Sequence, residues 1–292
     1  MQNVYKRFNV NKKYIWKKSK AIIISVLSFF GLVSPFFSLE DIFNKDRNNF
    51  LQEIVHFSFI LLFIGFLIFI AVTVYTLIKQ KVVICKFHNN HELSVSFGDI
   101  LNLPTEGRRN IIIPVNRCFD TIVDNELISE NTLHGKVLKV LYADNIFNQQ
   151  ELNKQIQDQL NEMGDIAMLD KAAKNKGNSY QYPAGTIVEI SDRDIRYFLV
   201  GFSKFDSDLH ASVSKREYLN SMNSILEYIE KKSQGFPTYL PLIGAGHSSA
   251  YQEEQTLLEF MLKMIQLNQN MVNCDINIVI DEQARDRISI LQ

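Results

Sequence analysis

The stretch Pro241-Leu-Ile-Gly-Ala-Gly-His-Ser-Ser249 decides how the rest of the chain is interpreted. Tyr239 and Leu240 precede it with strand character, and a helical pattern begins at Tyr251. Two glycines separated by one small residue let the backbone turn tightly and approach a ligand. The amides of such a turn, next to a helix N-terminus, form a site for a phosphate or pyrophosphate. An ordinary strand-to-helix turn is the alternative interpretation.

Composition excludes several classes of function. The chain has 292 residues, enough for one domain of ordinary size and an appendage. The formal net charge is -1, which does not favour nucleic-acid binding. The three cysteines, Cys85, Cys118 and Cys274, are scattered and form no zinc-binding pattern. We therefore expect buried free thiols in a reducing compartment and no metal site.

The first 39 residues divide into a basic part and an apolar part. Residues 1–20 carry seven cationic and no acidic side chains, and residues 21–39 carry no charge. The uncharged run approaches the roughly 20 residues that a helix needs to span a bilayer. A signal peptide is the alternative, but the run is long for one and no small-x-small cleavage site follows it.

A second uncharged run covers residues 54–78. As a helix it would be about 37 Å long, enough to span a bilayer with some tilt. The connection, residues 40–53, is mixed in charge, whereas lysines flank both outer ends. The positive-inside rule predicts an external loop and two cytoplasmic termini, with residues 79–292 in the cytoplasm. Two helices of one chain cannot enclose an aqueous path, so a conducting form requires several copies.

The remainder alternates between strand and helix patterns. Strands are predicted within 82–97 and at 111–116, 186–190, 196–202, 238–243 and 276–280. Helices are predicted from about Leu133, within 145–169, and at 212–232 and 253–267, followed by a terminal helix or short strand at 281–291. Residues 170–181 are predicted to be a loop, and their lysines to be solvated. This order favours an α/β fold, a three-layer α/β/α sandwich with a mixed sheet.

Three motifs occur at the ends of predicted strands. Gly98-Asp-Ile100 ends the first strand, Val115-Asn116 ends the next, and Pro241 to His247 joins a late strand to its helix. This order and spacing resemble the macro domain, an ADP-ribose-binding module. The resemblance implies that Asp99 accepts from the adenine amine, that Asn116 borders the distal ribose, and that the glycine-rich turn holds the diphosphate.

Several longer phrases resemble a narrower family, the ThsA-type transmembrane effectors of Thoeris anti-phage defence. In that family two transmembrane helices precede a macro-like domain. The phrases are Pro114 to Asp124, the run Asn131-Thr-Leu-His-Gly-Lys136, Pro183 to Thr186, Gly201 to Phe205, and Pro241 to Gly246. The resemblance covers about Gly98 to Ile280 by motif and the N-terminus by architecture.

The resemblance implies a ligand-binding set and no catalytic residues. Its members are Asp99, Ile100, Asn116, Asp120, Leu133, His134, Gly135, Ser203, Gly244, Ala245, Gly246, His247 and Ser248. Lys136 lies beside this set, and Phe205 is a candidate for stacking on a base.

Each of these assignments has a structural alternative. Asp99 suits a common Gly-Asp turn. Asp120 suits a cap or a loop-stabilising side chain. His134 suits a surface or packing position, Phe205 a core aromatic, and His247 the start of a helix.

The implied function is that of a sensor rather than an enzyme. A partner with a TIR domain would consume NAD and release an ADP-ribose derivative, in one branch histidine-ADP-ribose. The macro-like domain would bind this nucleotide, and the oligomeric effector would then compromise the inner membrane. The expected partners are membrane lipid, the signal nucleotide and further copies of the chain, without a cofactor or nucleic acid.

Two other functions stay open. One is an ADP-ribosyl hydrolase, although the second Asn and the glycine run of those enzymes are absent after Asn116. The other is a membrane-tethered module that binds proteins and has lost its nucleotide pocket.

Overall fold

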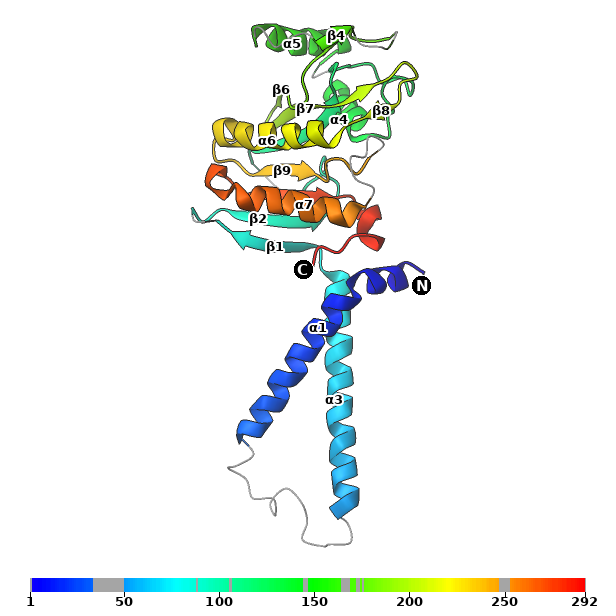
Figure 1. Ribbon diagram of the computed structural model, residues 1–292, viewed down its shortest axis with the longest axis vertical. Helices are drawn as coiled ribbons and strands as arrows, with labels where there is room; N and C mark the ends of the chain where they lie inside the picture. The colour runs from blue at the N-terminus through cyan, green and yellow to red at the C-terminus, as the bar shows by residue number, and fades with distance from the viewer. Residues whose placement is uncertain are drawn as a thin grey trace. The chain divides into compact units, whose positions relative to one another are not determined.

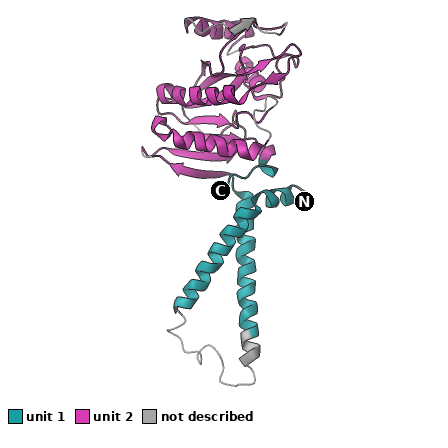
Figure 2. Cartoon of the chain, viewed as in Figure 1, with its two compact units in different colours: residues 1–80, 285–292 teal, residues 81–284 magenta. Residues whose placement is uncertain are grey.

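The computed structural model describes residues 2–33, 50–87, 89–104, 107–143, 147–163, 169–171, 174, 176–246 and 253–291. The chain forms two compact units, which Figure 2 colours separately. Residues 1–80 and 285–292 form the helical unit, and residues 81–284 form the sheet unit. The sheet unit therefore begins close to the predicted boundary, but the last residues of the predicted domain 79–292 belong to the helical unit.

The helical unit contains α1 (Gln2–Val33) and α3 (Phe50–Ile78) (Figure 1). The basic segment is thus helical from Gln2 and continuous with the first apolar run. The Trp16 ring in α1 lies 5.3 Å from the Phe69 ring in α3. Asn11, Ile15 and Ser19 are buried and lie one turn apart on one face of α1. Residues 34–49, with the end of the predicted first span and most of the predicted external loop, lie outside the described residues.

Helix α3 confirms that the second apolar run is helical. Within it, Val55–Ile78 has 24 residues and a mean hydropathy of 2.9. It is the one helix in the described part of the chain that is long and apolar enough to cross a membrane. Phe59, Leu62, Phe63 and Phe66 are exposed on its surface.

The sheet unit is built on a mixed sheet with the strand order β1-β2-β10-β9-β3-β7-β6. Strands β2, β10, β9, β3 and β7 run parallel, and the antiparallel strands β1 and β6 lie at the edges. The bounds are Lys81–Lys86 (β1), Glu92–Phe97 (β2), Arg109–Asn116 (β3), Ile187–Asp192 (β6), Ile195–Phe205 (β7), Thr238–Pro241 (β9) and Ile276–Ile280 (β10). The predicted core strands are therefore confirmed, and residues 82–97 are two strands.

Four helices cover the two faces of this sheet. They are α4 (Leu133–Tyr142), α5 (Gln149–Glu162), α6 (Lys215–Lys232) and α7 (Glu254–Leu267). Ile111 and Ile113 of β3 belong to the same buried cluster as residues of α4 and α5. Because side chains alternate along a strand, the other face is available to α6 and α7, which lie on the near side in Figure 1.

Aromatic contacts define that second face. The rings of Phe198 in β7 and Tyr228 in α6 lie 4.9 Å apart. The Tyr218 ring lies 5.8 Å from Phe202 and 5.8 Å from Phe260 of α7. These layers confirm the predicted α/β/α sandwich.

The shortest strands were not predicted from the sequence. β4 (Leu169–Lys171) pairs with β5 (Tyr180–Gln181), and β8 (Ala211–Ser212) pairs with β7. Strands of two or three residues carry no periodic signal, so the prediction of a loop at 170–181 was wrong at both ends. The terminal segment 281–291 contains a 3₁₀ helix, η4 (Glu282–Asp286), and another, η3 (Gln269–Met271), precedes β10.

Candidate functional site

The carboxyl ends of the parallel strands gather the predicted ligand-binding residues at one edge of the sheet. In the register, Ile280 of β10 lies opposite Phe97 of β2, and Val279 lies opposite Pro241 of β9. Asn116 of β3 lies opposite Ser203 of β7. The segments that follow these strands therefore share the edge at which α/β sheets bind ligands.

Asp99 follows β2 directly and is exposed. Its Oδ1 accepts from Leu101 N at 3.0 Å, and its carbonyl oxygen accepts from Asn102 N at 3.1 Å. This is the local turn proposed as the structural alternative, and it fixes the carboxylate at the edge. The neighbouring Ile100 is buried in the core, so only its backbone is placed to face a ligand.

The glycine-rich turn follows β9. Ala245 N donates to Leu242 O at 3.3 Å, and Gly244 has a φ of +92°. A turn closed in this way, with positive φ at its third residue, requires glycine there. A Cβ on Gly244 would also lie 3.0 Å from the Tyr218 ring, whereas one on Gly246 would meet no atom of the described residues within 4 Å.

The turn therefore has one constrained glycine and one open glycine. Gly246 is exposed, so its backbone is accessible at the edge. His247 and Ser248 lie outside the described residues.

Asn116 ends β3 and is buried. Its Oδ1 accepts from Cys118 N at 3.0 Å and Asp120 N at 3.3 Å, which shapes the following loop. Its Nδ2 has no hydrogen-bond partner within the described residues. A buried donor without a partner is costly, and a ligand oxygen at this edge would satisfy it.

Asp120 lies inside the protein, opposite Lys174. The lysine Nζ is 2.9 Å from both carboxylate oxygens, and the two side chains are 1% and 0% exposed. Burial raises the pKa of Asp120, and the hydrogen bond and charge of Lys174 oppose that effect. Asn178 N also donates to Asp120 Oδ1, at 2.7 Å. The geometry supports the loop-stabilising role for Asp120, and Lys174 is not solvated as predicted.

The start of α4 is packed tightly. Thr132 is the N-cap, and its side chain accepts from Gly135 N at 3.1 Å. A Cβ on Gly135 would lie 2.2 Å from Ser129 O. The Gly135 amide is thus already bonded within the protein, and Leu133 packs against the core.

His134 is buried and hydrogen-bonded to the backbone of Asp120. Burial lowers its pKa to about 4, so the imidazole is neutral near pH 7. The arrangement supports the packing role, because a neutral imidazole supplies no charge for a phosphate. Phe205 likewise packs against the core, as its structural alternative predicted.

Arg117 is a structural residue that the sequence did not reveal. Its side chain is 5% exposed. Its Nε donates to Tyr182 O at 2.6 Å, and Nη1 lies 2.7 Å from Glu217 Oε1. Its backbone N donates to Ser203 O at 2.7 Å. Arg117 therefore links the loop after Asn116 to β7, to Tyr182 and to α6; a cation next to a strand-end Asn carries no sequence signal for this role.

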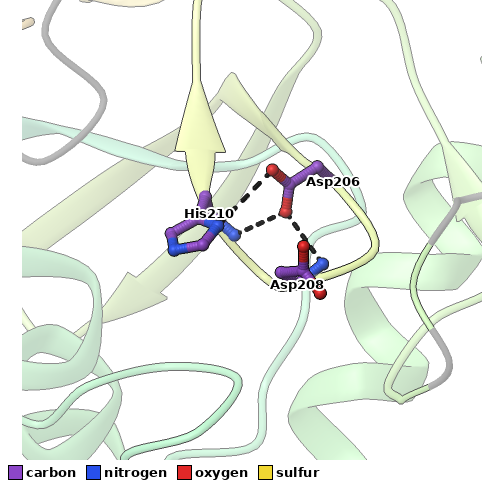
Figure 3. Close-up of side chains that lie close together, drawn as sticks. All are labelled: Asp206, Asp208 and His210. Atoms are coloured by element: carbon purple, nitrogen blue, oxygen red, sulfur yellow. Dashed lines mark hydrogen bonds and ion pairs between the residues drawn. The ribbon is translucent and has the colours of Figure 1, made fainter.

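An exposed cluster lies just beyond β7, where Asp206, Asp208 and His210 come together (Figure 3). Asp206 Oδ1 accepts from Asp208 N at 2.9 Å and His210 N at 2.8 Å, and Leu209 has a φ of +62°. The hydrogen bond from the His210 amide is the main cause of the lowered pKa of Asp206. These contacts explain the cluster as the turn that joins β7 to β8.

The family model described as "Thoeris protein ThsA, Macro domain" matches residues 93–281. The chain belongs to the ThsA macro-domain family. The match covers β2 from Leu93 onward, every later strand to β10, and all the described candidate site residues.

One curated relative and two solved structures are also similar. "Thoeris protein ThsA" of Bacillus amyloliquefaciens (strain Y2) is 28% identical over 185 residues, which are 62% of this chain and 58% of the relative. The Oceanobacillus iheyensis macrodomain with ADP is 14% identical, with a TM-score of 0.44 over 73% of this chain and 95% of that one. The same macrodomain with MES bound is 15% identical, with a TM-score of 0.44 over 73% and 94%.

Proposed function

We propose that this protein is a membrane-anchored receptor for an ADP-ribose-type nucleotide and acts in Thoeris anti-phage defence. The observation that carries the proposal is the shared edge of Asp99, the Gly244–Gly246 turn and Asn116 in a chain of the ThsA macro-domain family. Asp99 and Asn116 follow strands that are three positions apart in the sheet, about 14 Å at the usual strand spacing. An elongated ligand with a base at one end and a sugar at the other suits such a row.

The glycine-rich turn lies between those two positions. Its strand, β9, separates β10 from β3. Backbone amides at this point, with an open Gly246, suit the anionic middle of a nucleoside diphosphate sugar. The ligand would be ADP-ribose or a derivative such as histidine-ADP-ribose, made by a TIR-domain partner.

We infer that the receptor does not turn its ligand over. Burial raises the pKa of Cys118 to about 11, so its thiol stays protonated near pH 7. Asp120 is paired with Lys174 and His134 is neutral and bonded. The titratable groups next to Asn116 are therefore engaged in packing, and none is placed as a free general base.

Membrane anchoring rests on the helical unit. The apolar surface of α3 suits lipid, and Thr73 Oγ1 donates to Phe69 O at 2.8 Å, which satisfies its hydroxyl within the helix. In α1, Trp16 and the lysines around it are exposed, a combination that suits the cytoplasmic headgroup region. We place both termini in the cytoplasm and two spans in the inner membrane. Permeabilisation by such an effector requires several copies.

The test is a binding titration with the full-length protein in nanodiscs. ADP-ribose, histidine-ADP-ribose and NAD are titrated by calorimetry into the wild type and Asp99→Ala. We expect micromolar or tighter binding of one ADP-ribose derivative and at least about a ten-fold loss in the variant, as for one charge-assisted hydrogen bond.

Two matched controls make the test specific. Asp275 is also an exposed aspartate that accepts from a backbone amide, Glu92 N at 3.0 Å, but it precedes β10 and lies at the other end of that strand. Asp275→Ala should bind like the wild type. Gly246→Glu should abolish binding by repelling the diphosphate, whereas Gly246→Gln, of equal size, should retain much of it.

The outcomes separate the three functions. No heat with any nucleotide from a folded sample contradicts the receptor and favours the protein-binding module. Release of free ADP-ribose from histidine-ADP-ribose in the same cell favours the hydrolase.

A further inference from the structure

The last residues of the chain bind the first turns of α1. Arg7 Nε lies 2.8 Å from Asp286 Oδ1. One turn further along the helix, Asn11 Oδ1 accepts from Ser289 Oγ at 2.7 Å. Asn11 Nδ2 in turn donates to Arg7 O at 2.8 Å. The Asn11 side chain that the segment uses is therefore also bonded to the backbone of Arg7.

The same segment binds the last turn of α3. Arg285 Nη2 donates to Leu77 O at 2.8 Å and Lys79 O at 3.0 Å. Carbonyl groups at a helix C-terminus lack partners within the helix and carry partial negative charge. The guanidinium thus caps α3 while its neighbour Asp286 pairs with α1.

Burial shows that these contacts are not a loose surface association. Arg285, Ile288, Ser289 and Ile290 are all buried. We call residues 285–291 the C-terminal clasp. The clasp joins the beginning of α1 to the end of α3, so a displacement of the clasp acts on both helices.

The clasp follows directly from a strand of the candidate site. β10 ends at Ile280, whose carbonyl oxygen accepts from Gly98 N at 2.9 Å, next to Asp99. Asp281 then caps η4: its Oδ1 accepts from Gln283 N at 2.8 Å. η4 runs to Asp286. Hydrogen-bonded backbone therefore connects the adenine end of the proposed site to the Arg7 ion pair.

The chain passes between the two units at Gln80–Lys81 and again at Ala284–Arg285. A ligand changes a conformational equilibrium only through its different affinities for the two states. A coupling element must therefore be connected to both the ligand and the responding helices, and the clasp meets both conditions.

We propose that the C-terminal clasp transmits nucleotide binding at the Asp99 end of the sheet to the ends of α1 and α3. This proposal rests on the proposed function. Arg7, Arg285 and Asp286 are positioning residues in it: they set the helices and make no contact with the nucleotide.

The test uses full-length protein in liposomes of phosphatidylethanolamine and phosphatidylglycerol that contain a trapped dye. Leak is recorded with and without histidine-ADP-ribose, and with ADP-ribose, supplied on both sides. For Arg7→Asp and for Asp286→Arg, we expect the ligand-induced increase in leak to fall by at least about five-fold, the lower end of usual coupling. Nucleotide binding by calorimetry should stay within about two-fold of the wild type, because the site is untouched.

The charge-swapped double variant Arg7→Asp with Asp286→Arg restores the ion pair and should recover most of the ligand response. A merely destabilising effect of either change would add in the double variant instead. Lys231→Glu reverses a charge in an exposed pair with Glu227, 3.9 Å away in α6, and should leave the leak unchanged.

Each result decides a different statement. If the single variants respond to the ligand like the wild type, the proposed role of the clasp is wrong. The proposed receptor function is then unaffected. A wild type that binds no nucleotide, or that never leaks, contradicts the proposed function. The coupling through the clasp is then contradicted as well, because it rests on that function. A double variant that binds nucleotide but responds no more than the single variants also overturns the ion-pair mechanism.

Discussion

Gly244 and Gly246 are only two residues apart, but they differ in how strongly the backbone at each position requires glycine. Gly244 has a positive φ and faces the Tyr218 ring, whereas a Cβ added at Gly246 meets nothing within 4 Å in the described part of the chain. Gly244→Ala should lower the free energy of unfolding by about 1–3 kcal/mol, because an L-residue is strained there. Gly246→Ala should change it by less than about 0.5 kcal/mol. Thermal unfolding of the two variants in detergent measures the difference, and equal losses would contradict the turn geometry.

His134 makes stability depend on pH. Its folded pKa of about 4 lies below the unfolded value of 6.5, so the unfolded chain binds more protons between these values. Stability is therefore complete above pH 6.5 and falls as the pH drops toward 4. At pH 5 the loss should be about 2 kcal/mol.

Denaturant unfolding at pH 7 and pH 5 measures this effect. His134→Gln should be less stable at pH 7 but should lose less stability on acidification. His210→Gln, at an exposed turn, controls for the removal of an imidazole. An unchanged acid dependence in His134→Gln would show that other groups cause it.

Arg117 shows how one side chain connects several elements. Its guanidinium bonds Tyr182 O and Glu217 in α6, while its backbone bonds β7. Arg117→Ala should cost about 3–5 kcal/mol, because it leaves the Tyr182 carbonyl without its partner and removes the buried cation nearest to the Glu217 carboxylate. Arg117→Lys should recover only part of this, since an ammonium lacks the planar fork.

Lys204 provides a matched control for this measurement. Its Nζ lies 3.5 Å from the same Glu217 oxygen, but its side chain is exposed. Lys204→Ala should cost less than about 1 kcal/mol. A similar cost for Arg117→Ala would mean that the link between the strand ends and α6 is dispensable.

How well each element could be predicted depends on whether the interactions that fix it are local in the sequence. Helices α6 and α7 have a clear helical period, and strands β3 and β10 are short, almost continuously buried apolar runs, so a local sequence pattern marks each of them. The site motifs were recognisable for the same reason: Asp99, Asn116 and the glycine turn each follow a strand. The partners of Asp120 were not, because Lys174 lies far along the chain in a polar segment whose composition resembles a solvated loop. The ion pair exists only because the fold brings that segment to the loop after β3.

The C-terminal clasp escaped prediction for a related reason. Arg285, Asp286 and Ser289 resemble any polar chain end, and their partners Arg7 and Asn11 lie at the other end of the sequence. A local sequence pattern gives no indication of a contact between residues so far apart in the chain.

For the molecule as a whole, the apolar surface of α3 predicts how the protein partitions. Phe66 lies near the middle of Val55–Ile78 and is 58% exposed. Phe66→Arg should disfavour insertion by about 3 kcal/mol and reduce the share of protein that resists alkaline extraction from membranes. Leu267→Arg, at an apolar residue that is 81% exposed at the end of α7, should have no such effect. Full membrane retention of the Phe66 variant would contradict a span through α3.

The place of β10 in the sheet also determines when, during synthesis, the candidate site can form. This strand is made after both of its neighbours, and it lies between β2 and β9 in the interior of the sheet. During synthesis the two apolar segments emerge before β10, while the strand that bridges Asp99 and the glycine turn is still missing. A nascent or prematurely ended chain therefore has its helices but cannot assemble the row of strand ends. Translation itself thus delays the appearance of a responsive protein until β10 has been made.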